Sequence, residues 1–152
     1  MSAKSKPTVN TEAMEFFQFF DYAKPDLSTP KGLVKLVQSD ILRGMVQILS
    51  PGQRNNLHSH AAEDGFYFVL KGRVRFYGPD HILAGEFGPH QGLLIPRGTG
   101  YWFENLSEDG EELEMLHVSA FIKGEKSRRV DIEPKLPERI PSEQFSCRIR
   151  ND

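Results

Sequence analysis

Short apolar segments rich in Val, Ile, Leu and aromatic residues follow one another from Lys31 onward, and each is interrupted by Gly, Pro or Asp. Segments of this length, separated by turn residues, are typical of antiparallel strands joined by hairpins. The pattern therefore predicts an all-β sandwich or barrel. The predicted strands run over Gly32 to Gln38, Leu42 to Leu49, Asn56 to His60, Phe66 to Leu70, Arg73 to Tyr77, Leu93 to Pro96, Tyr101 to Glu104 and Leu113 to Phe121.

The two ends of the chain have a different pattern. Between Glu12 and Tyr22, apolar residues at positions 14, 16, 17 and 20 form a helical stripe, although the aromatic residues also fit a β-edge. The last thirty residues alternate charges with three prolines, and such a segment cannot bury enough apolar surface to order itself alone. We expect it to wrap the barrel or a partner subunit. The predicted organisation is an N-terminal segment with a short helix or strand (1–30), a barrel (31–122) and a charged C-terminal tail (123–152).

The balance of charge narrows the choice of partners. The 152 residues include 19 Lys and Arg against 21 Asp and Glu, which gives no broad positive surface for nucleic acid or an anionic membrane. No apolar run approaches the length of a membrane span, and the first ten residues lack the apolar block of a secretory signal. We therefore expect a cytoplasmic protein with a small-molecule partner. Cys147 is the only cysteine, so an intrachain disulfide and a Cys-based zinc site are excluded.

Two histidines separated by one residue form the first candidate site. On a strand, residues two apart point to the same face, so His58 and His60 are predicted to present two imidazoles to one point. Two neutral imidazoles are a natural chelate for a divalent first-row metal, whose further ligands must come from other strands. Taken alone, the spacing is more often that of two surface histidines beside a turn.

A second segment, about forty residues later, favours the metal hypothesis. It has the spacing P-x-G-x2-Y-x3-N and directly follows an apolar strand. Together the two segments resemble the paired motifs of the cupin superfamily, G-x5-H-x-H-x3-4-E-x6-G and G-x5-P-x-G-x2-H-x3-N, over about residues 40 to 120. The positions that match are Gly52, His58, His60, Gly72, Pro96, Gly98 and Asn105.

The resemblance implies an all-β double-stranded β-helix (jelly-roll) barrel of two antiparallel sheets, open at one end, with a metal or small ligand inside. Proteins of this family are commonly homodimers. Strand alternation places Phe66, Phe68 and Leu70 on the outer face of the barrel, and an apolar outer face must be covered. We expect a second subunit or the N-terminal segment to cover it, and a homodimer is predicted.

The chain departs from the first motif at the position of the family's glutamate. Gly65 stands there and offers no side chain to a metal. A β-bulge beside this glycine could turn Asp64 into the barrel, and Asp64 is therefore the predicted substitute ligand. The alternative is that Glu63 and Asp64 are both solvated loop acids.

The chain departs from the second motif at Tyr101, which replaces the family's third histidine. A bound cation would lower the pKa of a phenol and could make Tyr101 both a metal ligand and a catalytic group. The alternative is that Tyr101 lines the cavity and hydrogen-bonds a ligand or water. His117, in the last predicted strand of the barrel, is a further possible nitrogen ligand, although a single strand histidine is more often a packing residue.

The residues expected around His58 and His60 predict an aromatic and mostly neutral cavity. If position 65 faces inward, so does Tyr67, and Tyr101, Phe103 and Asn105 share one face of their strand. Such a lining suits an apolar or aromatic small molecule held by a few polar groups. Two arginines close to the motifs could reach a substrate carboxylate, although solvated surface is the commoner role. The predicted ligand-binding residues are Arg54, Tyr67, Arg97, Phe103 and Asn105.

Two functional hypotheses follow. The first is a metal-dependent enzyme that acts on a small organic molecule, with His58, His60 and either Asp64 or Tyr101 around one divalent Fe, Zn, Mn or Ni ion. The resemblance allows dioxygenase, isomerase, cyclase or lyase chemistry. The alternative is a binding or sensory cupin that has lost full metal ligation. The missing Glu at position 65 and the missing His at position 101 favour this alternative.

Overall fold

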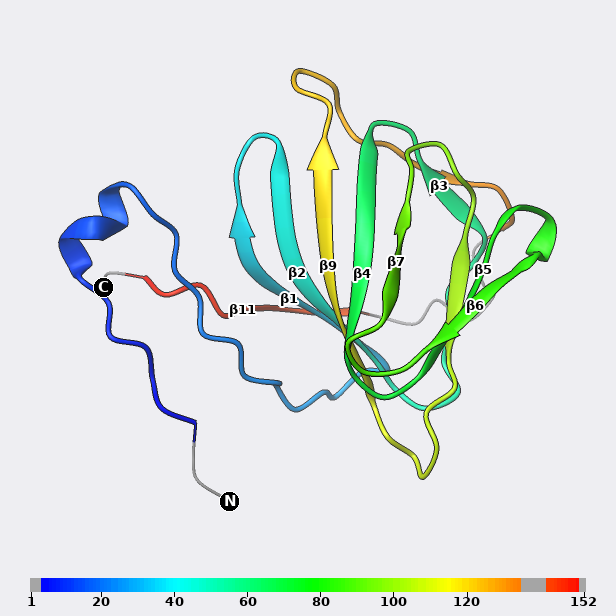
Figure 1. Ribbon diagram of the computed structural model, residues 1–152, viewed down its shortest axis with the longest axis horizontal. Helices are drawn as coiled ribbons and strands as arrows, with labels where there is room; N and C mark the ends of the chain where they lie inside the picture. The colour runs from blue at the N-terminus through cyan, green and yellow to red at the C-terminus, as the bar shows by residue number, and fades with distance from the viewer. Residues whose placement is uncertain (1–3, 135–141, 151–152) are drawn as a thin grey trace.

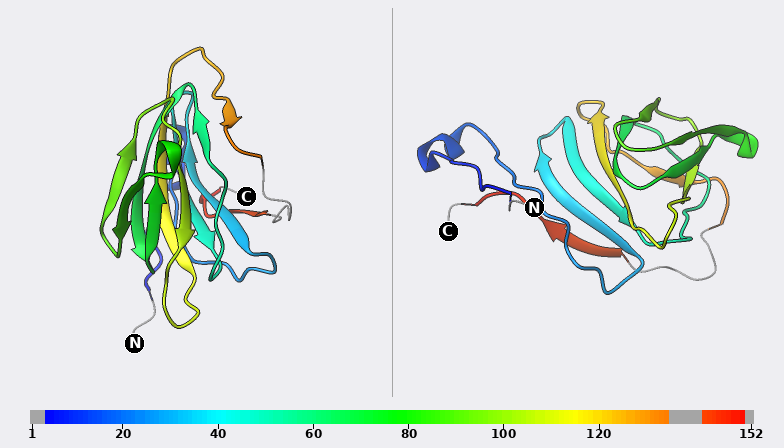
Figure 2. Two further views of the ribbon diagram at one scale, coloured as in Figure 1. Left: turned by 90° about the vertical axis from the view of Figure 1, so that its right-hand side faces the viewer. Right: turned by 60° about the horizontal axis from the view of Figure 1, so that its bottom comes forward.

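The computed structural model describes residues 4–134 and 142–150, in which two β-sheets pack face to face (Figure 1, Figure 2). The larger sheet has the strand order β11-β1-β2-β9-β4-β7. Its pairings are antiparallel except that β11 runs parallel to β1. The strands are β1 (Lys31–Gln38), β2 (Leu42–Leu49), β4 (Glu63–Lys71), β7 (Gly92–Ile95), β9 (Leu113–Phe121) and β11 (Ser142–Ser146).

The facing sheet is smaller and has the order β6-β5-β8. An isolated bridge between His58 and Tyr101 brings β3 alongside β8, and β3 pairs in turn with β10. The two sheets together confirm the predicted all-β double-stranded β-helix barrel. The strands on this side are β3 (His58–His60), β5 (Val74–Tyr77), β6 (Leu83–Phe87), β8 (Trp102–Asn105) and β10 (Arg129–Asp131).

Three of these strands were not predicted. β6 is an edge strand whose residues are exposed or half-buried, so it shows no apolar alternation. β10 and β11 lie in the charged stretch after residue 122 and are ordered by pairing with β3 and β1. This part of the chain therefore lies along the barrel as added strands. Pro137 and Pro141 are outside the described residues.

The N-terminal segment is less helical than its apolar stripe suggested. A 3-10 helix, η1 (Thr11–Glu15), begins at Asn10, whose side chain accepts a hydrogen bond from the Glu12 amide (3.0 Å). The predicted helix to Tyr22 is wrong beyond residue 15. Phe16 and Phe17 are 76% and 63% exposed and belong to neither core cluster of the described residues, so packing does not stabilise a longer helix. The chain then runs extended along the C-terminal strand region (Figure 1). A second 3-10 helix, η2, spans Pro79–His81. Among the described residues, no helix is long and apolar enough to cross a bilayer.

One hydrophobic core fills the space between the two sheets. Strand alternation sends Tyr67 and Val69 of β4 inward, as predicted, where they meet Phe76 of β5 and Phe103 of β8. The buried members of this core are Leu49, Tyr67, Val69, Val74, Phe76, Ile95, Tyr101, Phe103, Leu113 and Met115.

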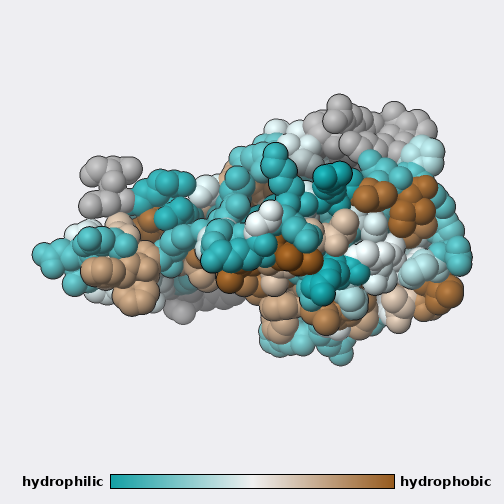
Figure 3. Space-filling model, turned by 90° about the horizontal axis from the view of Figure 1, so that it is seen from above, coloured by the Kyte–Doolittle hydropathy of each residue, from teal (hydrophilic) through white to brown (hydrophobic). Residues whose placement is uncertain are grey.

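A second core lies on the outer face of β1 and β2. Val34 and Ile48 are buried there under Tyr22 and Leu27 of the N-terminal segment, and Leu70 of β4 packs against the same cluster. Tyr22 and Leu27 of the N-terminal segment therefore cover part of the outer face, and Leu70 belongs to the same apolar cluster. Phe66 stays 40% exposed farther along β4. Seen from above, apolar side chains lie on the surface as separate patches (Figure 3).

Candidate functional site

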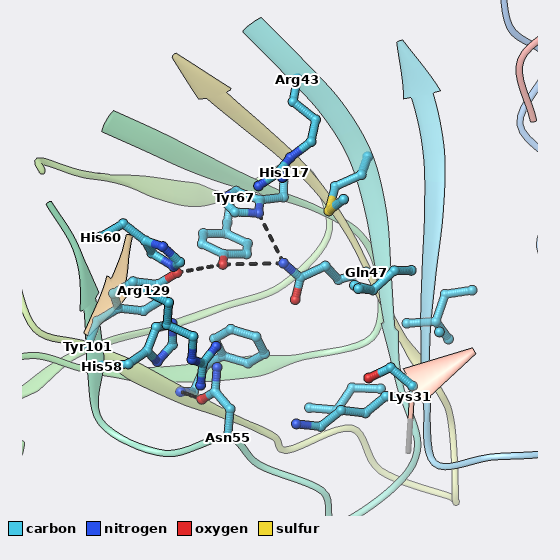
Figure 4. A pocket seen from close by; sticks show the side chains of 17 residues that line it. Lys31, Arg43, Gln47, Asn55, His58, His60, Tyr67, Tyr101, His117 and Arg129 are labelled. Carbon is cyan, nitrogen blue, oxygen red and sulfur yellow. Dashed lines mark hydrogen bonds between the residues drawn. The ribbon is translucent and has the colours of Figure 1, made fainter. Parts of the chain in front are cut away.

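A cavity of about 230 Å³ lies inside the barrel, between the two sheets. Its walls come from β1 and β2 on one side and from β3, β8 and β10 on the other, with β4 and β9 between them (Figure 4). Residues far apart in the sequence meet here. The lining includes Lys31, Arg43, Gln47, Asn55, His58, His60, Tyr67, Tyr101, Phe103, His117 and Arg129.

His58 and His60 lie side by side in this lining. Their ring centroids are 5.1 Å apart with the planes perpendicular. The backbones of His58 and Tyr101 exchange two hydrogen bonds, which hold the Tyr101 ring 4.5 Å from the His58 ring. The backbone oxygen of Asn56 lies 2.7 Å from Nδ1 of His58, so this nitrogen is the donor and Nε2 is free for a ligand. Burial lowers the pKa of His58 to about 4, and its ring is neutral at pH 7.

Glu63 is the carboxylate that accompanies this pair, and the sequence analysis did not place it there. Its Oε1 lies 2.8 Å from Nδ1 of His60, and its side chain is only 4% exposed. Burial raises the pKa of Glu63, but the hydrogen bond with His60 and the charge of Arg43 outweigh burial and hold that pKa below its usual value. An ionised Glu63 therefore orients His60 and leaves the other ring nitrogen available. The signal in the sequence was the three-residue spacing between His60 and Glu63.

Asp64 lies outside the cavity lining. Its carboxylate accepts a hydrogen bond from the backbone amide of Arg97 (2.8 Å) and so fixes the turn after β7. The bulge that would turn Asp64 inward does not form, since the register of β4 against β9 is regular from Glu63 to Val69. Neighbouring residues on a regular strand face opposite ways, so an inward Glu63 requires an outward Asp64.

Tyr101 and Tyr67 form a hydrogen-bonded pair of phenols. Their hydroxyl oxygens are 2.9 Å apart, and Gln47 Nε2 lies 3.4 Å from the Tyr67 oxygen. Burial raises the pKa of Tyr101 to about 12, and burial also raises the pKa of Tyr67 well above its usual value. Both phenols are therefore protonated at neutral pH and act as hydrogen-bonding groups.

His117 occupies the space that Gly65 leaves open. Its ring stacks on Tyr67 at a centroid distance of 4.0 Å, and Nδ1 lies 3.0 Å from Gln47 Nε2. A Cβ at position 65 would lie 2.9 Å from His117 Nε2, so any larger residue there would displace the ring. Burial lowers the pKa of His117 to about 3 and keeps the ring neutral. The residue missing from the first motif is thus matched by an imidazole from β9.

Among the predicted ligand-binding residues, Tyr67 and Phe103 line the cavity and three others do not. The Arg54 guanidinium packs 5.3 Å from the centroid of the Trp102 ring. Arg97 is exposed in the turn that Asp64 fixes. The Asn105 side chain donates hydrogen bonds to two backbone carbonyls and has a structural role.

Three other cations line the cavity, and the sequence analysis missed all of them. They are Lys31 on β1, Arg43 on β2 and Arg129 on β10 (Figure 4). No local motif marks them, because their strands meet only through the sheet pairing. Arg129 belongs to the charged C-terminal stretch, which gave no sign of reaching the barrel interior.

The described residues supply only part of a ligand set for the metal that the cupin resemblance implies. His58 and His60 offer two imidazoles whose Nδ1 atoms are held by outer partners, an arrangement that suits metal ligands. Gly65 supplies nothing, and the Tyr101 hydroxyl is already engaged in the hydrogen bond with Tyr67. No group of three or more His, Cys, Asp or Glu side chains in residues 4–134 and 142–150 is arranged to hold a metal ion. The described donor set therefore does not fit a resident metal with three protein ligands.

Known proteins resemble this chain in structure and not in sequence. No family model matches it, and no curated protein matches it in sequence. A double-stranded β-helix protein from Klebsiella pneumoniae superposes with a TM-score of 0.62 at 16% identity, covering 81% of this chain and 99% of that one. KdgF from Halomonas sp. superposes with a TM-score of 0.59 at 13% identity, covering 70% of this chain and 94% of that one. An RmlC-like cupin from Methanocaldococcus jannaschii gives 0.57 at 18% identity, over 70% and 92%. The chain therefore has the double-stranded β-helix fold of the cupin superfamily.

Proposed function

We propose that this cupin binds a small organic molecule inside its barrel, with its own side chains as the recognition groups. The observation that carries the proposal is the cavity of about 230 Å³, whose lining combines imidazoles, phenols, cations and apolar side chains. A concave site with a few convergent polar groups is the usual form of a small-molecule site. Of the two hypotheses, the geometry favours the binding protein, since the donor set lacks a third metal ligand.

The polar groups of the cavity suit direct hydrogen bonding to a ligand. The Tyr101 phenol stays protonated, and the His58 ring stays neutral, so neither side chain needs a countercharge. His60 is fixed by Glu63, and Tyr101 is fixed by Tyr67. Groups held in place before a ligand arrives lose little conformational entropy on binding, which favours affinity.

Binding can be tested by thermal unfolding of the full chain against a collection of small organic molecules. We expect at least one compound to raise the melting temperature. Tyr101→Phe should lower the affinity for that compound by about 5- to 15-fold, which is the effect of one lost hydrogen bond. Tyr77→Phe is the matched control, because its hydroxyl bonds Glu104 outside this cavity. A collection without any stabilising compound, or equal losses in the two variants, would contradict the proposal.

A metal-dependent enzyme is the second candidate, and one observation favours it. Both Nδ1 atoms of the histidine pair are held by Asn56 and Glu63, which leaves two Nε2 atoms for a metal whose other ligands a substrate would provide. Elemental analysis of purified protein beside a His58→Ala, His60→Ala double variant decides between the candidates. Stoichiometric metal in the parent protein and none in the variant would establish the second candidate in place of the first.

A further inference from the structure

We infer that the ligand of this cavity is a small organic acid, whose carboxylate is attracted by the cations that line the cavity, above all by Lys31 and Arg43. The inference rests on the proposed ligand cavity and adds the chemical class of the ligand. The three cations come from three strands and stand on different sides of the cavity, with Arg43 and Lys31 at opposite ends and Arg129 beside His58 (Figure 4). Among the described residues, no Asp or Glu lines this cavity.

The surrounding acids offset the charge of Arg129 and leave the charges of Arg43 and Lys31 in excess. Arg129 is held by Asp131 (3.1 Å) and by the side-chain oxygen of Asn56 (2.5 Å), so it is fixed in place and compensated. Arg43 approaches Glu63 at 3.8 Å, which is longer than a hydrogen bond, and Glu63 is shared with His60. Lys31 has no ion pair or hydrogen-bonded side-chain partner in the part of the chain that the structure describes.

Two buried polar atoms near the cavity lack hydrogen-bond partners among the described residues. Arg43 Nε and Glu63 Oε2 are both shielded from solvent, and neither has a hydrogen-bond partner in residues 4–134 and 142–150. A buried polar atom without a partner costs free energy, so an acceptor from outside would be favoured at Arg43. Burial lowers the pKa of Lys31, and the charge of Arg129 lowers it further. The second cause shows that the charges of Lys31 and Arg129 repel each other.

The remainder of the lining decides what kind of anion fits. Leu33, Met45, Leu49 and Phe103 add apolar surface to the lining of the same cavity. An inorganic ion would leave this apolar surface exposed to water, whereas an organic acid buries its hydrocarbon part against it. The volume of about 230 Å³ is below the range of about 300–1,000 Å³ found for drug-sized ligands. The site therefore suits a small organic carboxylate with a short aliphatic or aromatic body.

Matched pairs of acids and amides test the charge without changing the shape of the probe. Isothermal titration of the full chain would compare benzoate with benzamide, butyrate with butyramide, and inorganic phosphate. We expect a carboxylate to bind at least 10-fold more tightly than its amide, with the difference shrinking as salt is added. Phosphate alone is expected to bind more weakly than the better carboxylate, since it has no apolar part.

Variants assign the effect to the cavity cations. Lys31→Gln and Arg43→Gln are each expected to lower the affinity for the carboxylate by about 5- to 20-fold. The affinity for the amide should stay unchanged, which also shows that the cavity of the variant is folded. Lys35→Gln is the matched control, because Lys35 lies on the same strand, is exposed and is outside the cavity lining. Its affinity for the carboxylate should equal that of the parent protein.

The possible results separate this inference from the proposal beneath it. An amide that binds as tightly as its acid, or a carboxylate unaffected by Lys31→Gln and Arg43→Gln, would overturn the anion inference and leave the ligand cavity standing. If none of the acids or amides binds, and the wider collection of compounds also gives no stabilisation, both the inference and the proposed function are overturned.

Discussion

Gly65 and His117 are sterically coupled, and Gly65 is the position where this chain departs from the first cupin motif. The absence of a side chain at position 65 is what allows the His117 ring to stack on Tyr67. Interiors are close-packed, so a side chain removed from one strand must be replaced by volume from another. Here the space beside Gly65 is filled by the His117 imidazole.

Adding a methyl group at position 65 should disturb this arrangement. Gly65→Ala places a Cβ 2.9 Å from His117 Nε2, and we expect a loss of about 1–3 kcal/mol in the free energy of unfolding from overpacking. Combining it with His117→Ser should restore part of that loss, and a double-mutant cycle in denaturant would give a coupling of about 1 kcal/mol or more. Gly78→Ala is the control, since its nearest atom is 3.9 Å away. Additive effects of the two changes would contradict the steric pairing.

The buried histidines should make the protein sensitive to acid. The pKa of His58 falls from 6.5 to about 4 and that of His117 from 6.5 to about 3, in both cases through burial. As pH drops below 6.5 the unfolded chain binds protons that the folded protein does not, so stability is lost from about pH 6.5 down to about 4 through His58 and down to about 3 through His117. The loss is on the order of a few kcal/mol.

Denaturant unfolding at several pH values measures this loss. His117→Gln should show a smaller decrease between pH 6.5 and 4 than the parent protein, because one of the two groups has been removed. His90→Gln serves as the control, since His90 is exposed. A decrease of equal size in the His117 variant would show that the proton uptake has another origin.

Among the elements, β11 connects the end of the chain to the start of the barrel. It pairs in parallel with β1, and Phe145 packs against the outer core beneath the N-terminal segment. The Glu143 carboxylate also accepts a hydrogen bond from the Thr29 backbone amide (2.7 Å). β11 therefore protects the edge of β1, which supplies Lys31 to the cavity, from unpaired exposure.

Removing the Phe145 ring should loosen this edge. Phe145→Ala is expected to cost about 1–3 kcal/mol of unfolding free energy, less than a fully buried phenylalanine, because the ring is only partly buried. Hydrogen exchange of the β1 amides should speed up while the amides of β9 remain protected. Phe17→Ala, at a position that is 63% exposed, should change neither quantity. Equal exchange rates on β1 in the parent protein and the Phe145 variant would contradict the role given to β11.

At the scale of the whole molecule, an apolar stripe crosses the outer face of the larger sheet. Phe66 on β4 and Leu94 on β7 are register partners, and they are 40% and 63% exposed. Neighbouring exposed apolar residues of this kind are more often covered in an assembly than left to solvent. We predict that a second copy of the chain covers this stripe, which gives a homodimer.

Light scattering on the full chain measures the mass directly. The parent protein should give the mass of two chains, and Phe66→Ser combined with Leu94→Ser should shift it toward the 17.3 kDa of one chain. Ile82→Ser, which removes an exposed apolar residue elsewhere, should leave the dimer intact. A parent protein that is monomeric at working concentration would exclude this interface.

The sequence by itself determined the class of fold and the histidine pair. Turn residues and apolar alternation are local signals, and they predicted eight of the strands and the shared direction of His58 and His60. The inward direction of Tyr67 followed from the same two-residue period. The apolar pattern failed to predict β6, where an exposed edge removes the alternation. It also failed at the N-terminal stripe, where Phe16 and Phe17 stay exposed and packing does not stabilise a helix.

Only the tertiary structure decided which charges meet at the cavity. Glu63 rather than Asp64 faces inward because β4 pairs without a bulge at that point, and that regular register is a property of its pairing with β9. Lys31 and Arg43 lie on the neighbouring strands β1 and β2, and Arg129 reaches the same cavity from β10, far along the chain. Apolar alternation predicts which face of a strand a residue occupies. The residues that meet across a cavity depend on the order of all the strands, and the sequence of one strand does not determine that order.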